Sequence, residues 1–408
     1  MTELETGTYI TEWQERINLD RLRKGRLKRV QEQLKEKGLG AILCYSRRNQ
    51  RYITGLWLPQ WAASYRHNQV LLCRDDEPYV YVRNGWVYLF RRTAPWIKRD
   101  RVLPSFWYSV GAFGPDVTSK IFDSLANEVK KRMKDAGVAG EPIGVDMDTP
   151  IAVIRALERV GLEVVDGEEA MIDARAIKLE EEIECLRVAC AISEALFDEA
   201  RRNIKPGVRG NELMGTLYDK LYKLGSEPEF THMVICIGPW TDQPGPCRMY
   251  SDRMIRPGDL IHIDVVGASW MGYTACYYRN FVCGKASKEQ RDAWEVCNNL
   301  LEEILKAFKP GNTTKDVAEK FPTPDFWGYK EDWEVAGYCV AHGMGMGYDK
   351  PWISRPFSIE HPIKLEENMV VAVEPFYRGV RLEDMIVLRP GGYELLTKYP
   401  RELIECNL

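Results

Sequence analysis

Apolar and polar positions recur along this chain with two periods, one helical and one extended. In residues 20–38, leucine and valine recur at helical spacing, which predicts a helix that ends at Gly38. The three short apolar runs that follow, GAILCY, NQVLLC and PYVYVR, each predict a buried strand. Residues 115–136 and 150–160 again show the helical period, with the strand-like run PIGVDM between them. This alternation predicts an α/β domain.

The second half of the chain predicts a different domain with an internal repeat. A long charged helix is expected from about Lys178 to Asn203. Within it begins the segment LFDEARRNIKPG at 196–207, which is similar to LLEEILKAFKPG at 300–311. Each Lys-Pro-Gly ends one helix, and a second helical stretch follows. Strand-like segments punctuated by Gly and Pro come after both copies, as in a curved antiparallel sheet. We therefore expect two related halves packed about a pseudo-twofold axis, with a site between them.

Length and composition agree with two globular domains, residues 1–175 and 176–408. The chain is 45% hydrophobic and 28% charged, and its net charge of −4 gives no case for binding nucleic acid or an anionic membrane. No apolar run approaches the roughly 20 residues of a membrane span, and the polar N-terminus has no signal-peptide core. Eleven cysteines without a CxxC pair indicate reduced thiols. We expect a cytoplasmic protein.

Four acid or imidazole side chains lie within apolar, strand-like segments of the second half: Asp264, His342, Glu374 and Glu383. A charged side chain in such a segment costs roughly several kcal/mol unless it is paired or bound to metal. Exposure at a strand edge is the alternative for any one of them. Together they indicate a shared partner, and carboxylates with one imidazole suit a divalent ion such as Mn, Fe, Co or Zn. We expect them to converge so that one ion can touch at least three.

The order of these motifs resembles the creatinase and aminopeptidase P family. An Asp in IHIDVVG is followed by GYTACYYRN, HGMGMG, VEP and LED. The resemblance covers residues from about 175 to 408 well and the N-terminal domain more loosely. It implies a pita-bread fold for the C-terminal domain and a creatinase-type N-terminal domain. The family includes methionine aminopeptidase, aminopeptidase P, prolidase, creatinase and the DddP type of dimethylsulfoniopropionate lyase.

The resemblance also implies a metal site with one substitution. Metal-dependent members of the family carry two Asp, one His and two Glu around two ions, and the four residues named above match four of these five. The position of the second Asp is Cys276. A thiolate can bind Zn or Fe, but it is a poorer bridge than a carboxylate between hard ions. One divalent ion (Fe, Zn or Mn), or none, is therefore expected in place of two. If the thiol stays protonated and no metal is bound, Asp264, Glu374 and Glu383 have only His342 to balance them. Like-charge repulsion among these acids should then raise at least one carboxyl pKa.

Two further departures bear on the reaction. Peptidases of this family resemble one another in a His after a GP turn and in a second His seven residues after the HGxG His. Here the stretch GPWTDQPGPCRMYSDR contains no His, and the second position is Asp349. The His base of creatinases, from the first region, is missing too. The lyase branch also lacks both His, and it is similar to this chain in GLEVVDGEEA and in a closing Tyr-Pro. These features favour a lyase-like enzyme.

Proton removal next to a carboxylate needs a base and a group that holds the resulting enolate-like charge. Asp349 is the candidate base, with a surface turn as the alternative, and Tyr348 joins it in the candidate catalytic set. Arg279, or a metal ion, would hold the carboxylate of the substrate. Aromatic side chains would surround a sulfonium or quaternary ammonium head by cation–π contact, with core packing as the alternative for each. The candidates are Trp240, Trp270, Trp57, Trp61 and Tyr65.

Three functions stay open at this point. The first is a lyase or hydrolase that acts on a small zwitterion, the second is an Xaa-Pro dipeptidase-like metallohydrolase with a modified site, and the third is an inactive module of the same fold that binds a ligand or partner. The resemblance to creatinases also implies a homodimer in which the N-terminal domain closes the partner's active site. The apolar stretch at 56–65 suits such an interface. The charge run at 178–184 is expected to be a solvated helix face.

Overall fold

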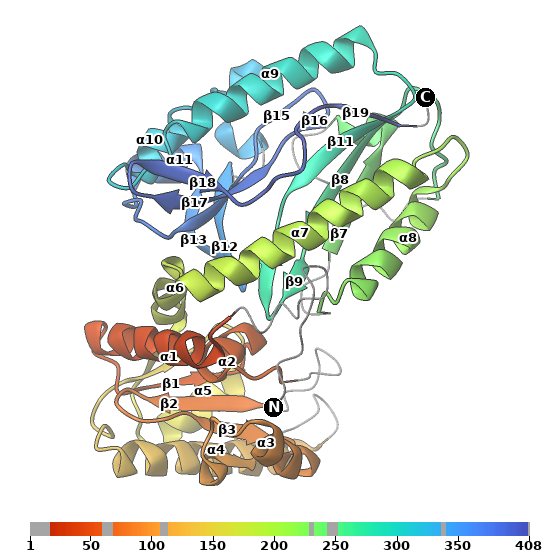
Figure 1. Ribbon diagram of the computed structural model, residues 1–408. Coiled ribbons are helices and arrows are strands. Elements are labelled where there is room, and N and C mark those ends of the chain that lie inside the picture. Colours follow the sequence, from red (N-terminus) through yellow and green to blue (C-terminus); the bar gives the residue numbers. More distant parts are fainter. Residues whose placement is uncertain are drawn as a thin grey trace, which may run out of the picture. The chain divides into compact units, whose positions relative to one another are not determined.

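The computed structural model describes residues 17–58, 68–106, 113–227, 232–242, 252–335 and 340–406. The described chain forms two compact units, one from Asn18 to Arg175 and one from Ala176 onward. The N-terminal unit is built on one sheet and the C-terminal unit on several (Figure 1). Each unit has its own hydrophobic core. The expected two-domain α/β architecture, with a creatinase-type first domain and a pita-bread second domain, is confirmed.

The N-terminal unit is a mixed six-stranded sheet with helices packed on it. The strands follow the order β4-β3-β2-β1-β5-β6, in which β1 pairs antiparallel with β2 and parallel with β5. The strands are β1 (Ala41–Cys44), β2 (Gln69–Cys73), β3 (Tyr79–Val82), β4 (Val102–Pro104), β5 (Ile143–Val145) and β6 (Val164–Asp166). The helices are α1 (Leu19–Glu36), α2 (Arg47–Thr54), α3 (Val87–Thr93), α4 (Pro115–Asp135), α5 (Ile151–Arg159) and α6 (Glu168–Ala176).

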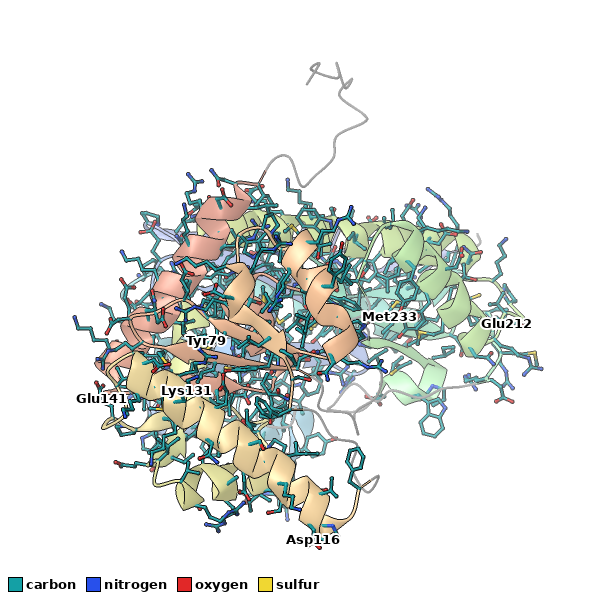
Figure 2. All side chains as sticks on the ribbon, turned by 90° about the horizontal axis from the view of Figure 1, so that it is seen from below. Tyr79, Asp116, Lys131, Glu141, Glu212 and Met233 are labelled. Atoms are coloured by element: carbon teal, nitrogen blue, oxygen red, sulfur yellow. The ribbon has the colours of Figure 1, made fainter. Side chains whose placement is uncertain are left out.

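Local sequence explains the elements that were predicted in this unit. Helix α1 begins after Asn18, whose side chain accepts a hydrogen bond from the Arg21 amide, and it buries one apolar face. Helix α4 buries a similar face, whereas Asp116 and Lys131 are exposed to solvent (Figure 2). Elements α2, α3, α6, β4 and β6 were not predicted. The two strands have three residues each and the three helices have seven to nine, which leaves little room for a recognisable period.

The described C-terminal unit contains two larger sheets and two sheets of two strands, and each half of the repeat begins with a pair of helices. The first half comprises α7 (Glu180–Asn203), α8 (Gly210–Lys223), β7 (His232–Ile237), β8 (Leu260–Val266), β9 (Ala268–Trp270), β10 (Tyr273–Ala275) and β11 (Tyr278–Cys283). The second comprises α9 (Lys288–Leu305), α10 (Thr314–Ala318), β12 (Ala341–Gly345), β13 (Gly347–Ile353), α11 (Arg355–Glu360), β14 (Val370–Val373), β15 (Phe376–Tyr377), β16 (Val380–Arg381), β17 (Asp384–Arg389), β18 (Gly392–Leu395) and β19 (Ile404–Cys406). The larger sheets have the orders β19-β11-β8-β7 and β13-β12-β14-β17-β18.

The internal repeat is visible at equivalent turns of the two halves. Gly207 lies between α7 and α8, and Gly311 lies between α9 and α10, with φ angles of 89° and 98°. This left-handed conformation is open to glycine and strained for other residues. The two amides donate to equivalent backbone carbonyls, Gly207 to Ile255 at 2.9 Å and Gly311 to Leu365 at 3.0 Å. The repeated Lys-Pro-Gly therefore marks one turn that occurs twice.

The prediction of a solvated helix face at residues 178–184 is wrong. Lys178, Glu181 and Glu182 are buried, because the N-terminal part of α7 packs on β9 and β10. Tyr273 of β10 donates a hydrogen bond to Glu182 at 2.8 Å. None of the helices described in the structure has the length and hydropathy that crossing a bilayer would require.

Candidate active site

Five predicted metal ligands come from strands, or from the ends of strands, in the C-terminal unit. Asp264 lies on β8 and His342 on β12. Glu374 directly follows β14, Cys276 lies between β10 and β11, and Glu383 lies between β16 and β17. Strands β12 and β14 are neighbours in the five-stranded sheet, whereas β8 and β11 are neighbours in the four-stranded sheet. The site therefore takes residues from both halves of the repeat.

The distances show that these side chains form one cluster. His342 Nε2 lies 3.7 Å from Glu383 Oε1 and 3.8 Å from Glu374 Oε1. The ligand atoms of Cys276, His342 and Glu383 all lie within 4.8 Å of one another. Asp264 is close enough for its charge to raise the pKa of both Cys276 and Glu383. The structure thus brings the five predicted ligands together.

Burial controls the protonation of this cluster. It raises the pKa of Glu383 well above its usual value, and the charges of Glu374 and Asp264 raise it further. Like-charge repulsion was the expected cause of a raised carboxyl pKa, but for Glu383 it contributes less than burial does. Burial, followed by the charges of Glu383 and Asp264, also raises the pKa of the Cys276 thiol. Burial lowers the pKa of His342 to about 4, which keeps this imidazole neutral near pH 7.

Glu383 provides the test of whether a metal ion fits these residues. It is fully buried, and neither carboxylate oxygen accepts a hydrogen bond among the described residues. The Cys276 thiol lies against this carboxylate and acts to lower its pKa, but it does not reach regular hydrogen-bond geometry. A buried carboxylate without donors is costly unless a cation compensates it. Thiolate, imidazole and carboxylate together suit Zn or Fe, so the residues fit one divalent ion.

The glycines of the HGMGMG segment allow a close approach of β13. A side chain at Gly343 would overlap the backbone carbonyl oxygens of Asp349 and Lys350, and one at Gly345 would overlap the Asp349 carboxylate. The ladder between β12 and β13 is also irregular between His342 and Gly343. The HGMGMG motif therefore has two roles. It supplies His342, and its glycines let β12 and β13 approach closely enough to form the hairpin.

Tyr348 and Asp349 are neighbours on β13 with different contacts. The Tyr348 ring meets the His342 ring edge-on, with ring centroids 4.7 Å apart. Burial, and then the charges of the cluster, raise the pKa of Tyr348, so its hydroxyl stays protonated. Asp349 is buried, not at a surface turn, and its Oδ2 accepts a hydrogen bond from Lys178 Nζ at 3.0 Å. Tyr348 therefore packs against the cluster, whereas Asp349 pairs with Lys178.

Arg279 has no donor left for a substrate, so its predicted role as a carboxylate-binding residue is wrong. It is buried within the C-terminal unit. Its five N–H groups donate to the backbone carbonyls of Tyr278, Glu383, Tyr399 and Pro400 and to the carboxylate of Asp384. The closing Tyr-Pro of the chain thus supplies two acceptors for this guanidinium. Arg279 holds β11 to the segment after Glu383 and to the C-terminal segment, and its role is structural.

The predicted aromatic ligands differ in burial and in the unit to which they belong. Trp270 is 9% exposed, which fits core packing. Trp240 is 48% exposed, and Trp57, which is 39% exposed, belongs to the N-terminal unit. Trp61 and Tyr65 lie outside the described residues. These exposures do not decide whether the aromatic side chains bind a cation, so their role stays a prediction.

Sequence reasoning missed three residues that contact the cluster or its neighbours. The Trp352 ring stacks on the His342 ring, with ring centroids 5.7 Å apart and ring planes at 27°. The Tyr278 hydroxyl donates a hydrogen bond to Glu374 at 3.4 Å. Lys178 is the third. Trp352 could have been found, because it lies four residues after Tyr348 on the same strand, and such residues share one face. Lys178 gave no such signal, since a charged residue ahead of a helix is ordinarily solvated.

Two family models match this chain. Residues 184–390 match metallopeptidase family M24, and residues 26–177 match the creatinase/prolidase N-terminal domain. The first match alone spans half of the chain, so the chain belongs to metallopeptidase family M24. The resemblance inferred from the motif order is confirmed.

Several named proteins are similar to the chain. The dimethylsulfoniopropionate lyase DddP of Roseovarius nubinhibens is 26% identical over 98% of this chain and 91% of that protein. An Xaa-Pro dipeptidase of Pyrococcus horikoshii is 27% identical over 64% of this chain and 74% of that protein. Among solved structures, an Xaa-Pro dipeptidase from Bacillus anthracis has a TM-score of 0.73 at 22% identity and covers 94% of this chain and 99% of that one. The last likeness concerns the fold alone.

Proposed function

We propose that this chain is a non-peptidase enzyme that cleaves a small zwitterion, as a lyase similar to DddP or as a related hydrolase. The observation that carries the proposal is the composition of the site around His342. A thiol, Cys276, stands where the metal-dependent members of the family have a bridging carboxylate. A carboxylate, Asp349, paired with buried Lys178, stands where the peptidases have their second His. The similarity to a DddP protein over nearly the whole chain supports the same conclusion.

In the lyase form of this proposal, a base removes a proton from the carbon next to the substrate carboxylate. The electron pair of that C–H bond forms a carbon–carbon double bond, and the carbon–sulfur bond breaks. The sulfur leaves as a neutral thioether, so dimethylsulfoniopropionate would give dimethyl sulfide and acrylate. Asp349 is the proposed base.

The residues of the cluster would stabilise the charge that develops on the carboxylate. Tyr348, which stays protonated, is proposed to donate a hydrogen bond to the enolate-like oxygen. Cys276, His342 and Glu383, with Asp264 and Glu374 beside them, would hold one divalent ion. Such an ion supplies Lewis acidity at the same oxygen when bound. The tight packing of Tyr348 against His342 and Trp352 fixes the direction of the phenol.

The direct test is turnover of dimethylsulfoniopropionate by protein loaded with Fe, Zn or Mn. We expect release of dimethyl sulfide, and we expect Asp349→Asn and Tyr348→Phe each to lower kcat about 10² to 10⁴-fold, as is usual for a positioned proton-transfer group. Equal turnover by the wild-type protein and both variants would remove these residues from the mechanism. If neither this substrate nor related sulfonium and quaternary ammonium acids react, the lyase proposal fails.

We also predict that the protein lacks Xaa-Pro dipeptidase activity at ordinary rates, because both peptidase His positions are occupied by other residues. The measurement is hydrolysis of a Gly-Pro dipeptide in the presence of Mn, with a prolidase as the positive control. Efficient cleavage would favour the modified metallopeptidase. Absence of both metal and turnover would favour the third function, an inactive binding module.

A further inference from the structure

A methionine side chain lies between helix α7 and the segment that carries Cys276. The sulfur of Met385, on β17, accepts a hydrogen bond from the Cys276 backbone amide at 3.3 Å. The Cys190 thiol of α7 donates to the same sulfur, and these two sulfur atoms are 3.7 Å apart. All three side chains are buried. The Met385 sulfur therefore connects the backbone of a predicted metal ligand to α7.

The fold explains why the Cys276 amide bonds to a side chain. The carbonyls of Ala275 and Tyr277, on either side of it, accept hydrogen bonds from backbone amides at or just after the end of β8, at 3.0 and 3.2 Å. In such an antiparallel ladder the amide of the intervening residue points away from the partner strand. A buried amide needs an acceptor, and the Met385 thioether supplies it here, although a thioether is a weak acceptor.

Cys276 is attached to its surroundings at two points. Its amide bonds to Met385, and its thiol lies against the carboxylate of Glu383. Glu383 and Met385 are two residues apart where β17 begins, and alternate residues of a strand project to the same face. The Met385 sulfur therefore holds the Cys276 backbone where its thiol meets Glu383. Contacts of this kind orient the residues that bind an ion and tune its affinity.

We propose that Met385 is a positioning residue for Cys276, and that its thioether favours binding of an ion that accepts a thiolate, such as Zn, over Mn. This inference rests on the metal site of the proposed function and does not depend on which substrate is cleaved. Mn prefers carboxylate oxygens, so its affinity depends less on where the thiol lies.

Cys190 completes this arrangement from α7. The methionine side chain is flexible, and the contact with the Cys190 thiol keeps its sulfur in place. Burial raises the pKa of the Cys190 thiol, which therefore stays protonated and donates. The position of Cys276 thus depends on two sulfur contacts in sequence, one from α7 to β17 and one from β17 to the Cys276 amide.

Cobalt(II) is the probe for a bound thiolate, because thiolate ligation gives this ion a strong charge-transfer absorption in the near ultraviolet. Titration of the metal-free full-length protein should give this absorption, and Cys276→Ser should abolish it. Met385→Leu nearly preserves the volume of the side chain and removes the sulfur. We expect it to weaken the absorption per bound ion and to lower Zn affinity about tenfold or more, while Mn affinity falls less than about threefold.

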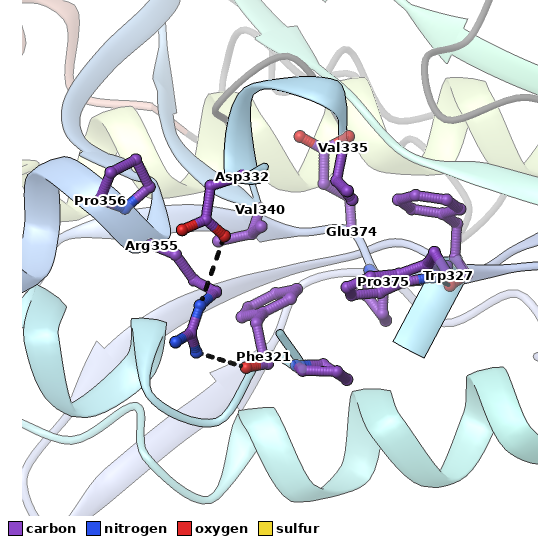
Figure 3. Close-up of a pocket in the computed structure, with 11 residues that line it drawn as sticks. Phe321, Trp327, Asp332, Val335, Val340, Arg355, Pro356, Glu374 and Pro375 are labelled. Carbon is purple, nitrogen blue, oxygen red and sulfur yellow. Dashed lines mark hydrogen bonds and ion pairs between the residues drawn. The ribbon is translucent and has the colours of Figure 1, made fainter. Parts of the chain in front are cut away.

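Two control variants separate positioning from a loss of packing. Met369→Leu makes the same change at another buried methionine, whose sulfur accepts a hydrogen bond from the Glu366 amide at 3.5 Å. Val340→Ala loosens a narrow pocket lined by Val340, Trp327 and Glu374 (Figure 3). The Glu374 carboxylate would serve both ions, so this change should affect Zn and Mn affinity alike. Neither control should alter the cobalt absorption per bound ion or the ratio of Zn to Mn affinity.

Cys190→Ala tests the same contact from α7 without altering β17. It should shift the ratio of Zn to Mn affinity in the same direction as Met385→Leu, by a smaller factor. Melting curves show which variants are folded, and Cys190→Ala decides the question if Met385→Leu does not fold.

The remaining outcomes contradict the inference or separate it from the proposed reaction. An unchanged ratio of Zn to Mn affinity in the folded variants, or an equal loss for both ions, would show that Met385 only packs. A wild-type protein without the thiolate absorption would refute the inference, since Cys276 would then not bind the ion. A shifted ratio without turnover of any onium substrate would support the positioning role and reject the proposed lyase function, whereas turnover with an unshifted ratio would do the reverse.

Discussion

Cys276 is the residue at which this site departs from the family pattern. Its thiol lies beside His342 and Glu383, and burial together with the neighbouring acids raises its pKa. The site therefore carries one negative charge fewer than a site with an aspartate, unless a metal ion draws off the thiol proton. A softer ligand at this position favours Zn or Fe over Mn.

The first prediction concerns Cys276→Asp. Restoring a carboxylate is expected to raise Mn affinity about tenfold or more, or to raise the Mn content to two ions per chain, and to lower native turnover because the charge of the pocket changes. Metal titration with Mn, Zn and Fe measures this, with Cys73→Ala in the N-terminal unit as the control for loss of a buried thiol. If neither stoichiometry nor rate changes, Cys276 is a packing residue.

A second prediction at this scale concerns Asp146 of the N-terminal unit. Burial raises its pKa from 3.8 to about 6, although the amides of Tyr45 and Ser46 donate to it. Between pH 3.8 and about pH 6, Asp146 binds more protons in the folded state than in the unfolded state. Its contribution to stability is thus fully present below pH 4 and is lost as the pH rises through 6. The loss should be roughly 3 kcal/mol.

The measurement is urea unfolding of the wild-type protein and of Asp146→Asn between pH 4 and pH 7, followed by a probe in the N-terminal unit. Over this interval the wild-type protein should lose free energy of unfolding that the variant does not lose. Parallel pH profiles would show that Asp146 titrates alike in the folded and unfolded states.

At the scale of elements, one buried ion pair joins the segment before α7 to strand β13. Lys178 and Asp349 have side chains that are 0% and 1% exposed, and their charged atoms are 3.0 Å apart. Two packed elements are thus linked by charges that water does not screen. Removing one member of such a pair leaves the other buried and uncompensated, which ordinarily costs about 3–5 kcal/mol.

Lys178→Met is therefore expected to destabilise the C-terminal unit by about that amount. The double variant Lys178→Met with Asp349→Leu should recover much of the loss, because it leaves no buried charge. Thermal unfolding of the two variants gives the comparison. Lys288→Met, which removes a solvent-exposed pair with Asp292 on α9, is the control and should leave the melting temperature nearly unchanged. A double variant no more stable than the single one would mean that the pair contributes through packing.

At the scale of the whole molecule, the N-terminal unit exposes several large apolar side chains, among them Trp57, Tyr88, Leu89 and Trp96. Exposed apolar surface of this kind is typical of interaction sites. We predict a homodimer, as the resemblance to creatinases implies, in which this unit covers the partner's active site. Light scattering at micromolar concentration should give twice the chain mass of 47.1 kDa. Replacing Tyr88 and Leu89 with Asp should give monomers, and a monomeric wild-type protein would contradict the prediction.

The sequence by itself determined the parts of this protein that depend on local pattern. Hydrophobic periodicity predicts α1, α4, α5, α7 and the strands β1 to β3. The repeated Lys-Pro-Gly predicts the two related halves, because a proline and a glycine end a helix whatever the rest of the chain does. The order of motifs also identified the family and the five clustered residues, since a charged residue in an apolar strand needs a partner wherever the strand lies.

Only the tertiary structure decided how these side chains are paired. The sequence predicts Arg279 as a substrate ligand, but in the fold five acceptors, two of them from the C-terminal segment, use all its donors. Lys178 looked solvated until packing buried it against Asp349. The pocket whose lining includes Trp327 and Phe376 joins segments about fifty residues apart in sequence. Hydrogen-bond saturation, burial and pocket shape depend on contacts between distant segments, and a sequence pattern read locally carries no information about them.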